Sequence, residues 1–381
     1  MNQIPGSAAV TVRPVAGRRD LKAFIRFPHR LYRGSPYWVP NLDFDEWNTL
    51  RPEKNPAFDH CQAKYWLAFR QGRIVGRIAA ILNRKHIDKW NQRYMRFGWV
   101  DFIDDPAVSR ALFSAVEAWA RECGMDAVHG PLGFSDMDRE GMLVEGFDER
   151  ATMITNYNFA YYPAHLEAMG YGKDVDWLEY DLTVPPEPDP TIARIAAIAL
   201  RRNRLHLLPA RRTSDLLPYA HELFRLLDEE YKHLYGVVPL TARQVDQYIS
   251  QYLGFIRPEF VPVVLDENNR MVAFGITMPS LARALQKAKG RLLPFGLIHV
   301  MRALRRNDRA ELYLVAVRSE YQGKGVNAIL MDEMHRLFIR RGIRRVEANP
   351  ELETNQNVRG QWKHYPARQH KRRRAYIKRL A

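Results

Sequence analysis

The clearest structural signal in this 381-residue chain is Leu312-Tyr313-Leu314-Val315-Ala316-Val317, followed after a short polar connection by Gln322-Gly323-Lys324-Gly325-Val326-Asn327. The first run is short and apolar, as in a buried strand, and an amphipathic helix pattern begins after the second. Glycines let the backbone approach an anion closely, and the N–H groups and dipole of a helix N-terminus attract negative charge. The segment therefore predicts a strand, a loop and a helix with a pyrophosphate site at the loop, to which Lys324 adds a charge.

Outward from this segment, the two halves of the chain show the same order of predicted elements. Each has a hairpin, a strand, a helix that ends at a glycine, a short strand, a second helix and a closing strand. The glycines that end the first helix, Gly124 and Gly342, lie 218 positions apart. In the second half the elements are expected at 260–265, 271–278, 311–317, 325–340, 345–348, 355–364 and 374–380. In the first half they are expected at 65–69, 74–82, a strand ending near 102, 107–122, 127–129, 161–169 and 177–182.

A proline-rich segment, Pro185-Pro186-Glu187-Pro188-Asp189-Pro190, separates the two series. Prolines at this density continue neither a helix nor a central strand, and they favour an extended spacer. We therefore expect a first domain at 1–184, a linker at 185–190 and a second domain at 191–381. The fold class expected for each is α/β (α+β), a mixed central sheet flanked by helices, and the repeat is one of architecture more than of sequence.

At 317–327, and in the order of elements over 204–381, the chain resembles the GNAT superfamily of acyl-CoA N-acyltransferases. The resemblance implies acetyl-CoA or a longer acyl-CoA as co-substrate. It further implies a pantetheine arm on the backbone of Val315, Ala316 and Val317, and pyrophosphate on the loop from Gln322 to Asn327. Asn355 matches the asparagine that opens the family's last helix. Counting back along the strand puts Glu311 at the family's general base, although Glu311 could also be an exposed strand charge.

Three features depart from the family's pattern, and one of them is Tyr365-Pro366-Ala367 in place of the Gly-Phe that usually follows the family's last helix. Asn327 stands where the loop usually ends in Gly or Ala, and Trp362 stands where many members have a tyrosine general acid. Tyr365, one turn later, is either a substitute acid or a packing residue. In the first half the position of the acyl-CoA loop holds Asp104-Asp105-Pro106, where two carboxylates would repel a pyrophosphate and proline offers no N–H. We therefore expect the first module to keep the fold without this donor site.

An acidic, glycine-rich loop follows the predicted strand at 127–129. On the site side of such a fold it would line a pocket for a small-molecule or peptide amine, whereas its alternative reading is a solvated loop. The residues expected to contact the amine are Asp136, Asp138, Glu145 and Tyr157.

The basic residues are unevenly distributed. The chain has a formal net charge of +15, and residues 191–381 contribute +18 against −3 from the remainder. This asymmetry suggests an anionic partner, such as the cofactor's phosphates, an acidic acyl-carrier protein or a membrane surface, with solubility alone as the alternative. The segment 280–309 mixes apolar and basic residues, which suits peripheral membrane contact, a carrier protein or a lid on its own domain. The basic C-terminus alternates with apolar residues like a strand and carries no nucleic-acid-binding signature, so nucleic acid is not expected.

The remaining features exclude several other classes of protein. The two cysteines and twelve histidines show no metal-ligand spacing, and no metal is expected. No apolar run reaches the roughly 20 residues of a transmembrane helix, and we expect a cytoplasmic protein. Three functions agree with these patterns: an acyl-CoA-dependent N-acyltransferase, an acyltransferase whose donor is an acyl-carrier protein or aminoacyl-tRNA, and a non-catalytic binding protein of the same fold.

Overall fold

The computed structural model describes residues 9–252, 254–355, 362 and 365–380. The chain divides into two compact units that do not follow the two halves of the sequence. Unit 1 contains residues 1–177, 282–299 and 371–381, and unit 2 contains 178–281 and 300–370. These bounds differ from the predicted ones: residues 282–299 and 371–381 belong to the first unit, and residues 178–184 belong to the second.

Unit 1 is built on one sheet with strand order β1-β2-β3-β4-β5-β14, and β6 also pairs with β14. All its strand pairs are antiparallel except β4 and β5. The strands are β1 (Thr11–Pro14), β2 (Cys61–Arg70), β3 (Arg73–Asn83), β4 (Tyr94–Phe102), β5 (Ala127–Gly130), β6 (Met142–Glu145) and the second part of β14 (Ala367–Arg379). The helices are α1 (Gly17–Leu31), α2 (Asp43–Thr49), α3 (Arg84–Trp90), α4 (Pro106–Glu122), α5 (Tyr161–Ala168) and α9 (Ala282–Ala288).

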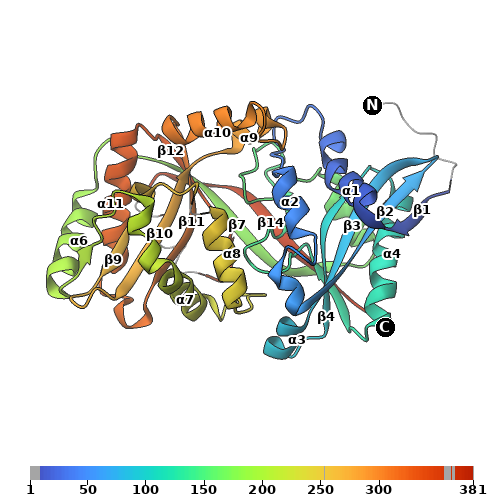
Figure 1. The fold of residues 1–381 in the computed structure, drawn as a ribbon, viewed down its shortest axis with the longest axis horizontal. Helices are drawn as coiled ribbons and strands as arrows, with labels where there is room; N and C mark the ends of the chain where they lie inside the picture. The colour runs from blue at the N-terminus through green and yellow to red at the C-terminus, as the bar shows by residue number, and fades with distance from the viewer. Residues whose placement is uncertain (1–8, 253, 356–361, 363–364, 381) are drawn as a thin grey trace. The chain divides into compact units, whose positions relative to one another are not determined.

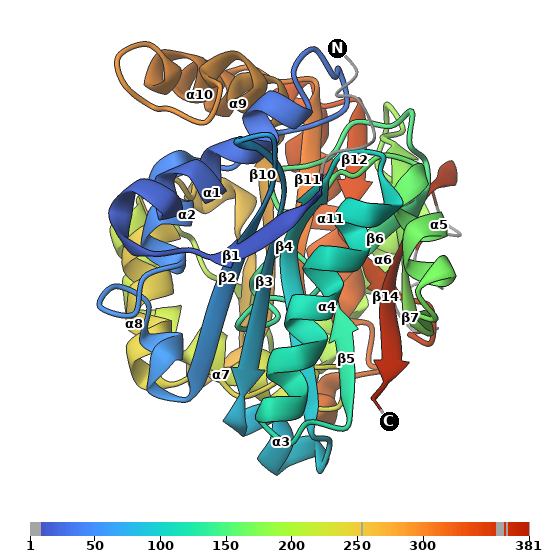
Figure 2. The same cartoon turned by 90° about the vertical axis from the view of Figure 1, so that its right-hand side faces the viewer.

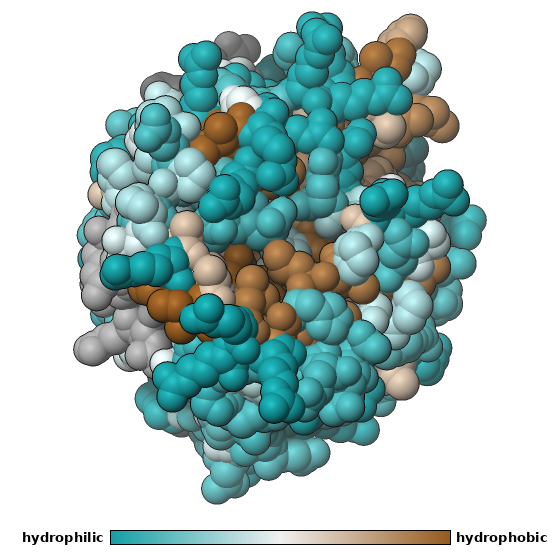
Figure 3. Space-filling view, turned by 90° about the vertical axis from the view of Figure 1, so that its left-hand side faces the viewer, coloured by the Kyte–Doolittle hydropathy of each residue, from teal (hydrophilic) through white to brown (hydrophobic). Residues whose placement is uncertain are grey.

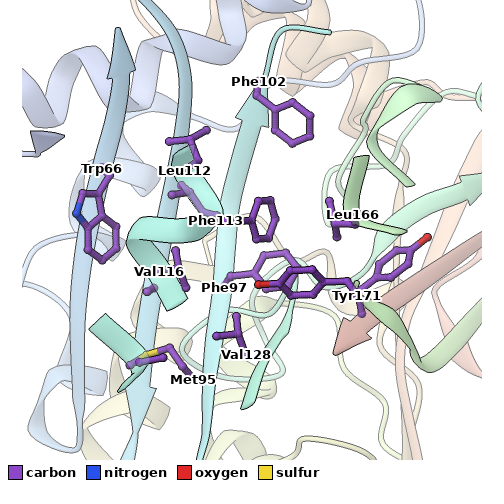
Figure 4. Packing of buried hydrophobic residues seen from close by; sticks show 14 of the residues in the cluster. Trp66, Met95, Phe97, Phe102, Leu112, Phe113, Val116, Val128, Leu166 and Tyr171 are labelled. Atoms are coloured by element: carbon purple, nitrogen blue, oxygen red, sulfur yellow. The ribbon is translucent and has the colours of Figure 1, made fainter. Parts of the chain in front are cut away.

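Alternating residues of β2 and β3 face opposite sides of this sheet, so the sheet has two apolar layers. Trp66 and Ile78 pack with α4 and α5 on one face (Figures 2 and 4), where Phe97, Leu112, Phe113 and Tyr171 complete the cluster. Leu67 and Ala79 pack with α1 on the other face. Burial on both faces explains why β3 reads as a continuous apolar run.

Unit 2 has strand order β7-β12-β11-β10-β9-β8, with only the β11–β12 pair parallel. The strands are β7 (Gly172–Thr183), β8 (His206–Leu207), β9 (Val263–Leu265), β10 (Met271–Pro279), β11 (Arg309–Val317), β12 (Arg345–Ala348) and β13 (Glu351–Leu352). The helices are α6 (Pro190–Arg202), α7 (Ala220–Tyr231), α8 (Ala242–Tyr252), α10 (Gly296–Arg305), which begins in unit 1, and α11 (Val326–Arg341). Helices α6 and α11 lie side by side (Figure 1) and cover an apolar layer of this sheet.

The predicted α/β class, with a mixed sheet flanked by helices, is confirmed. The two hairpins, the helix at 106–122, the helix at 326–341 and the strand at 345–348 all form close to where they were expected. The final strand starts seven residues earlier than expected, at Ala367. The helix expected at 355–364 falls largely outside the described residues.

The proline-rich segment is irregular up to Asp189, the residue that precedes α6. Asp189 caps this helix, because its carboxylate accepts hydrogen bonds from the N–H groups of Thr191 and Ile192, and Pro190 takes the first helical position, which needs no N–H partner.

The basic C-terminal strand has its partners inside unit 1. Arg372 and Arg374 both bind the carboxylate of Asp176, and Lys378 Nζ lies 2.9 Å from Glu117 Oε1. Part of the basic excess of the second half is therefore balanced in the fold, because basic residues near the C-terminus pair with acidic residues of the first half.

Candidate active site

Strand β11 carries a bulge at Tyr313. Ile276 of β10 pairs with Leu314 and Thr277 pairs with Leu312, so Tyr313 is an extra residue on β11. Before the bulge Ala310 and Leu312 face the apolar layer under α11, and after it Val315 and Val317 do. The bulge thus shifts the alternation of the strand by one residue, and bulges commonly re-aim side chains beside active sites.

Beyond the bulge, β11 separates from its parallel neighbour β12. The two strands pair only from Arg309 with Arg345 to Leu312 with Ala348, whereas β11 continues to Val317. The hydroxyl of Tyr231, from α7, donates to the carbonyl of Val315 at 3.0 Å and lies 3.5 Å from its N–H. Both polar backbone groups of Val315 therefore point to the side on which β12 has left the sheet, which is the edge expected to hold pantetheine.

The loop after β11 presents an uncapped helix N-terminus. Gly323 and Gly325 have φ angles of 72° and 80°, in the left-handed region that favours glycine. Gly325 precedes α11, whose N-terminus has no side-chain cap. A Cβ atom on Gly325 would lie 3.0 Å from Ile195 of α6, so this glycine also permits close helix packing. Val326 is buried and Asn327 half-buried, while the exposed Lys324 lies over the Tyr321 ring.

Two sets of polar contacts hold this loop against α7. The buried guanidinium of Arg318 donates to the carbonyl of Met271 at 2.6 Å, to Glu229 at 3.0 Å and to Glu222 at 3.2 Å. Glu230 accepts from the N–H of Ser319 at 2.9 Å and from the side-chain amide of Gln322 at 2.9 Å. The Gln322 side chain, expected at the pyrophosphate, thus bonds within the protein in this structure.

Glu311 is buried on β11, with only 1% of its surface exposed. One carboxylate oxygen accepts from the Ser280 hydroxyl at 2.5 Å and the other from the Tyr313 hydroxyl at 2.7 Å. Burial, reinforced by the neighbouring Glu311 carboxylate, raises the pKa of Tyr313 well above its ordinary value, so this phenol stays protonated. Glu311 is therefore a buried group in a short hydroxyl–carboxylate chain, unlike the exposed strand charge that was its alternative reading.

Tyr365 is not placed beside Glu311. It packs with Leu337 and Phe338 of α11 and with Leu312, on the face of β11 opposite Glu311, and its ring lies 5.6 Å from that of His335. Burial raises its pKa to about 12. Trp362 packs in the same cluster and donates to Glu351. Asn355 donates its backbone N–H to the carbonyl of Leu352 at 2.9 Å.

Sequence reasoning missed a second group of buried polar residues in unit 2. Glu347 lies directly opposite Glu311 in the parallel register, and its carboxylate is 3.4 Å from Nε2 of His370. Glu179 lies close to both, and potential ligand atoms of the three side chains all lie within 4.8 Å of one another, a set that by residue type could hold a divalent cation. The sequence feature that could have indicated this group is the alternation Arg345-Val346-Glu347-Ala348, which places charged side chains on one face of a central strand.

Unit 1 has the same strand–helix arrangement but its donor position is filled. The N-terminus of α4 is capped by Asp105, whose carboxylate accepts from the N–H of Ala107 at 2.9 Å. The gap where β4 leaves β5 contains residues 131–133: the N–H of Leu132 donates to the carbonyl of Phe97 at 2.8 Å, and a Cβ on Gly98 would meet the Leu132 carbonyl. The module therefore uses its own chain and its own carboxylate where a donor would bind.

The four residues expected to contact an amine all belong to unit 1. The Asp138 carboxylate accepts from the N–H groups of Phe134 and Ser135 and so closes its own turn, with Asp136 half-buried beside it. Glu145, on β6, is exposed and forms an ion pair with Arg372 of β14. Tyr157 donates its hydroxyl to the carbonyl of Phe147 and packs edge-on against Tyr32. The structure thus gives Asp138 and Tyr157 intramolecular hydrogen bonds.

The acidic turn instead predicts a pH dependence of stability. Burial, together with the nearby Asp136 and Asp138, raises the pKa of Glu140 to about 8, and burial raises that of Asp138 to about 6. Because the unfolded pKa values lie near 4, the folded chain binds more protons between about pH 4 and pH 8. The free energy of unfolding should therefore fall as the pH rises through this window.

We expect Glu140→Gln to remove most of that dependence, because the amide stays neutral at every pH. Urea unfolding at pH 8 should show the variant more stable than the wild type by roughly 2 kcal/mol, with little difference at pH 5. Glu122→Gln, which changes an exposed carboxylate on α4, is the matched control. A variant less stable than the wild type at pH 8 would contradict the assignment.

Unit 2 exposes several large apolar side chains. Figure 3, which views the side of the ribbon where Figure 1 labels α6 and α11, shows a hollow of apolar side chains with hydrophilic ones around it. The large apolar side chains that unit 2 exposes include Ile195 and Ile198 of α6, Leu217 and Tyr252. Among the described residues, no helix combines the length and apolar character needed to cross a membrane.

Comparison with known proteins identifies the family of the chain. The family model described as "Acetyltransferase (GNAT) family" matches residues 220–364. Protein YghO of Escherichia coli K12 is 30% identical over 380 residues, covering 97% of this chain and 95% of YghO. A protein of Caulobacter vibrioides named bacterial ceramide synthase is 28% identical over 361 residues, covering 92% of each.

Several solved structures share the fold at low sequence identity. A tandem GNAT protein from the clavulanic acid biosynthesis pathway superposes with a TM-score of 0.56 at 13% identity, covering 97% of this chain and 98% of that one. A GCN5-related N-acetyltransferase from Sphaerobacter thermophilus gives 0.53 at 12% identity, with 97% and 95% covered. The family-model match and the 30% identity to YghO over 97% of the chain show that this chain belongs to the GNAT family, with a fold shared with a tandem GNAT protein.

Proposed function

We propose that this protein is an acyl-CoA-dependent N-acyltransferase whose donor binds unit 2 and whose acceptor is a long-chain amine. The observation that carries the donor assignment is the uncapped N-terminus of α11 beside the open edge of β11. The N-terminus of α11, which follows Gly325 and has no side-chain cap, suits a pyrophosphate, and the backbone of Val315 suits the amide groups of pantetheine, which would replace the Tyr231 hydroxyl.

The proposed reaction forms an amide and releases a thiol. The amine nitrogen attacks the thioester carbonyl carbon, the C–N bond forms, and the C–S bond breaks as the tetrahedral intermediate collapses. Backbone N–H groups of β11 stabilise the developing oxyanion. Glu311 accepts the proton lost by nitrogen, Tyr313 protonates the departing thiolate, and the 2.7 Å hydrogen bond between these two residues returns the proton from Glu311 to Tyr313.

The acceptor class rests on the relative named bacterial ceramide synthase, which aligns with 92% of this chain. A ceramide is the N-acyl derivative of a long-chain amino alcohol, so the acceptor we propose is a sphingoid-type base and the donor a fatty acyl-CoA. The exposed apolar side chains of unit 2 suit such lipid-like substrates.

The donor site is tested by Asn327→Asp, which places a negative charge in the first turn of α11. The charge should stabilise the helix slightly through its dipole, yet repel the pyrophosphate and weaken acyl-CoA binding at least about tenfold. Isothermal titration with acetyl-CoA and palmitoyl-CoA, beside thermal unfolding, measures both effects. Asn268→Asp, in the exposed turn between β9 and β10, makes the same change of charge elsewhere.

Three outcomes separate the alternatives. Weaker binding by Asn327→Asp alone, with amide formation from palmitoyl-CoA and sphinganine by the wild type, supports the proposal. Absence of binding to either acyl-CoA by folded wild-type protein would overturn the donor assignment and leave a carrier-protein or aminoacyl-tRNA donor. Tight acyl-CoA binding without turnover on short and long-chain amines would point to a binding protein.

A further inference from the structure

The segment from α9 to α10 exposes an unusual group of apolar side chains. Leu293, Phe295 and Ile298 expose 76%, 69% and 62% of their surfaces, and Leu297 and Met301 are exposed as well. All five lie within nine residues. Side chains of this size and exposure are costly to leave in water, so a contiguous set marks a surface that contacts another apolar phase.

These side chains are additional to the face by which α10 packs on the protein. Val300 and Leu304, one turn apart, are buried and anchor the helix. Leu297 and Met301 form a separate stripe that faces outward, and Leu293 and Phe295 extend it into the loop before the helix. Figure 2 shows α9, α10 and the loop that joins them.

The segment is also strongly basic. Residues 282–306 contain seven Lys or Arg residues and no Asp or Glu. Arg302, Arg305 and Arg306 are exposed at the end of α10 opposite the apolar tip, and Arg283, Lys287, Lys289 and Arg291 lie on or just after α9. From Ile298 to Arg305 the helix rises about 10 Å, so an apolar tip can enter acyl chains while the guanidinium groups reach the phosphates.

Residues 282–299 of the segment belong to unit 1 and are held there by hydrogen bonds. The side-chain amide of Gln286 donates to the carbonyls of Pro36 and Trp38, both at 2.9 Å, and the N–H of Asp43 donates to the carbonyl of Gly290 at 2.8 Å. A Cβ on Gly290 would meet His29 and Asn41, so the chain passes close to its support there. These contacts orient the apolar side chains outward, which a lid closed over its own domain would instead bury.

We propose that the segment 282–306 docks this protein on the surface of a bilayer that contains anionic lipids. Apolar insertion alone would not select for charge, and basic residues alone would not account for the exposed Leu293, Phe295 and Ile298. The combination is the one that an anionic membrane surface satisfies. The docking does not depend on transferase chemistry.

Vesicle sedimentation tests this directly. The full-length wild type should bind phosphatidylcholine vesicles that contain about one third phosphatidylglycerol, bind pure phosphatidylcholine much more weakly, and lose affinity as NaCl rises from about 0.1 M to about 0.5 M. Phe295→Ser combined with Ile298→Ser should lower the partition coefficient at least about tenfold. Arg302→Gln combined with Arg305→Gln should abolish the preference for phosphatidylglycerol.

The control variant combines Ile198→Ser with Leu217→Ser, two exposed apolar side chains of unit 2 outside the segment. Unchanged vesicle binding by this variant and by Glu311→Gln supports docking through 282–306 independently of catalysis. The proposal is overturned if the wild type ignores vesicles of both compositions, or if the control variant loses binding equally. It is also overturned if Phe295→Ser/Ile298→Ser converts a dimer to a monomer in light scattering without changing vesicle binding, since the patch would then bind a second copy.

Discussion

Glu311→Gln is expected to lower kcat by roughly 100-fold or more without changing the Kd for acyl-CoA. The amide cannot accept the proton that the amine loses, and its NH2 group would face either Ser280 or Tyr313, whose hydroxyls now donate to the carboxylate. The lost hydrogen bond should cost about 1–2 kcal/mol of stability, which is too little to unfold the protein. The measurements are steady-state amide formation, titration with acyl-CoA and thermal unfolding on the same preparation.

The matched control is Glu320→Gln, which neutralises an exposed carboxylate in the connection after β11. Tyr313→Phe should reduce kcat while retaining the base, and the pH dependence of its kcat should lose the limb that reports the proton donor. If Glu311→Gln keeps wild-type turnover, Glu311 is not the base. His370 and Glu347, whose side chains are 3.4 Å apart, would then be the pair to test.

Arg318→Ala should lower the free energy of unfolding by about 2–4 kcal/mol and weaken acyl-CoA binding. The guanidinium is buried and joins the start of the donor loop to Met271 on β10 and to Glu222 and Glu229 on α7. Its removal leaves a buried carbonyl and two carboxylates without that partner, and it releases the loop that precedes α11. Urea titration gives the stability and calorimetry gives the affinity.

Arg318→Lys should recover only part of the loss, since a lysine ammonium cannot reproduce the three-directional contacts of the planar guanidinium. Arg340→Ala removes an exposed partner of Glu333 and should cost less than about 1 kcal/mol. Equal stability of Arg318→Ala and Arg340→Ala would show that the loop is held by other contacts, of which Glu230 with Ser319 and Gln322 is the nearest candidate.

Local patterns were sufficient to predict most elements of the fold. The strand at 345–348, the helix after Gly325 and the hairpin through Gln71-Gly72 depend on apolar periodicity and on turn residues with positive φ, which neighbouring residues specify. The contrast between the two modules was also visible, because α4 is preceded by the carboxylate of Asp105 and begins at Pro106, whereas α11 is preceded by Gly325. The donor loop is local in the same sense and was readable as a motif.

The acid–base assignment shows where such patterns stop. Glu311 could be located by counting along its strand, but its partner could not, because the bulge at Tyr313 changes which side chains of β11 share a face. Counting put Trp362 at the position of the family's tyrosine and left Tyr365 as either a substitute acid or a packing residue, and the fold packs Tyr365 against the cluster beneath α11. Likewise Glu347 and His370 are 23 positions apart in sequence, and only the pairing of strands brings them to 3.4 Å.

What followed from sequence alone was therefore the class of fold, the repeated order of elements and the glycine-rich loop before α11, since each depends on periodicity and on residues within one turn of one another. Tertiary structure decided the rest. It assigned β14 to the sheet of unit 1, where Asp176 and Glu117 neutralise its basic residues, and it chose the neighbours of Glu311. It also left Leu293, Phe295 and Ile298 in solvent. These outcomes depend on strand register and on burial by distant segments, and no local pattern encodes either.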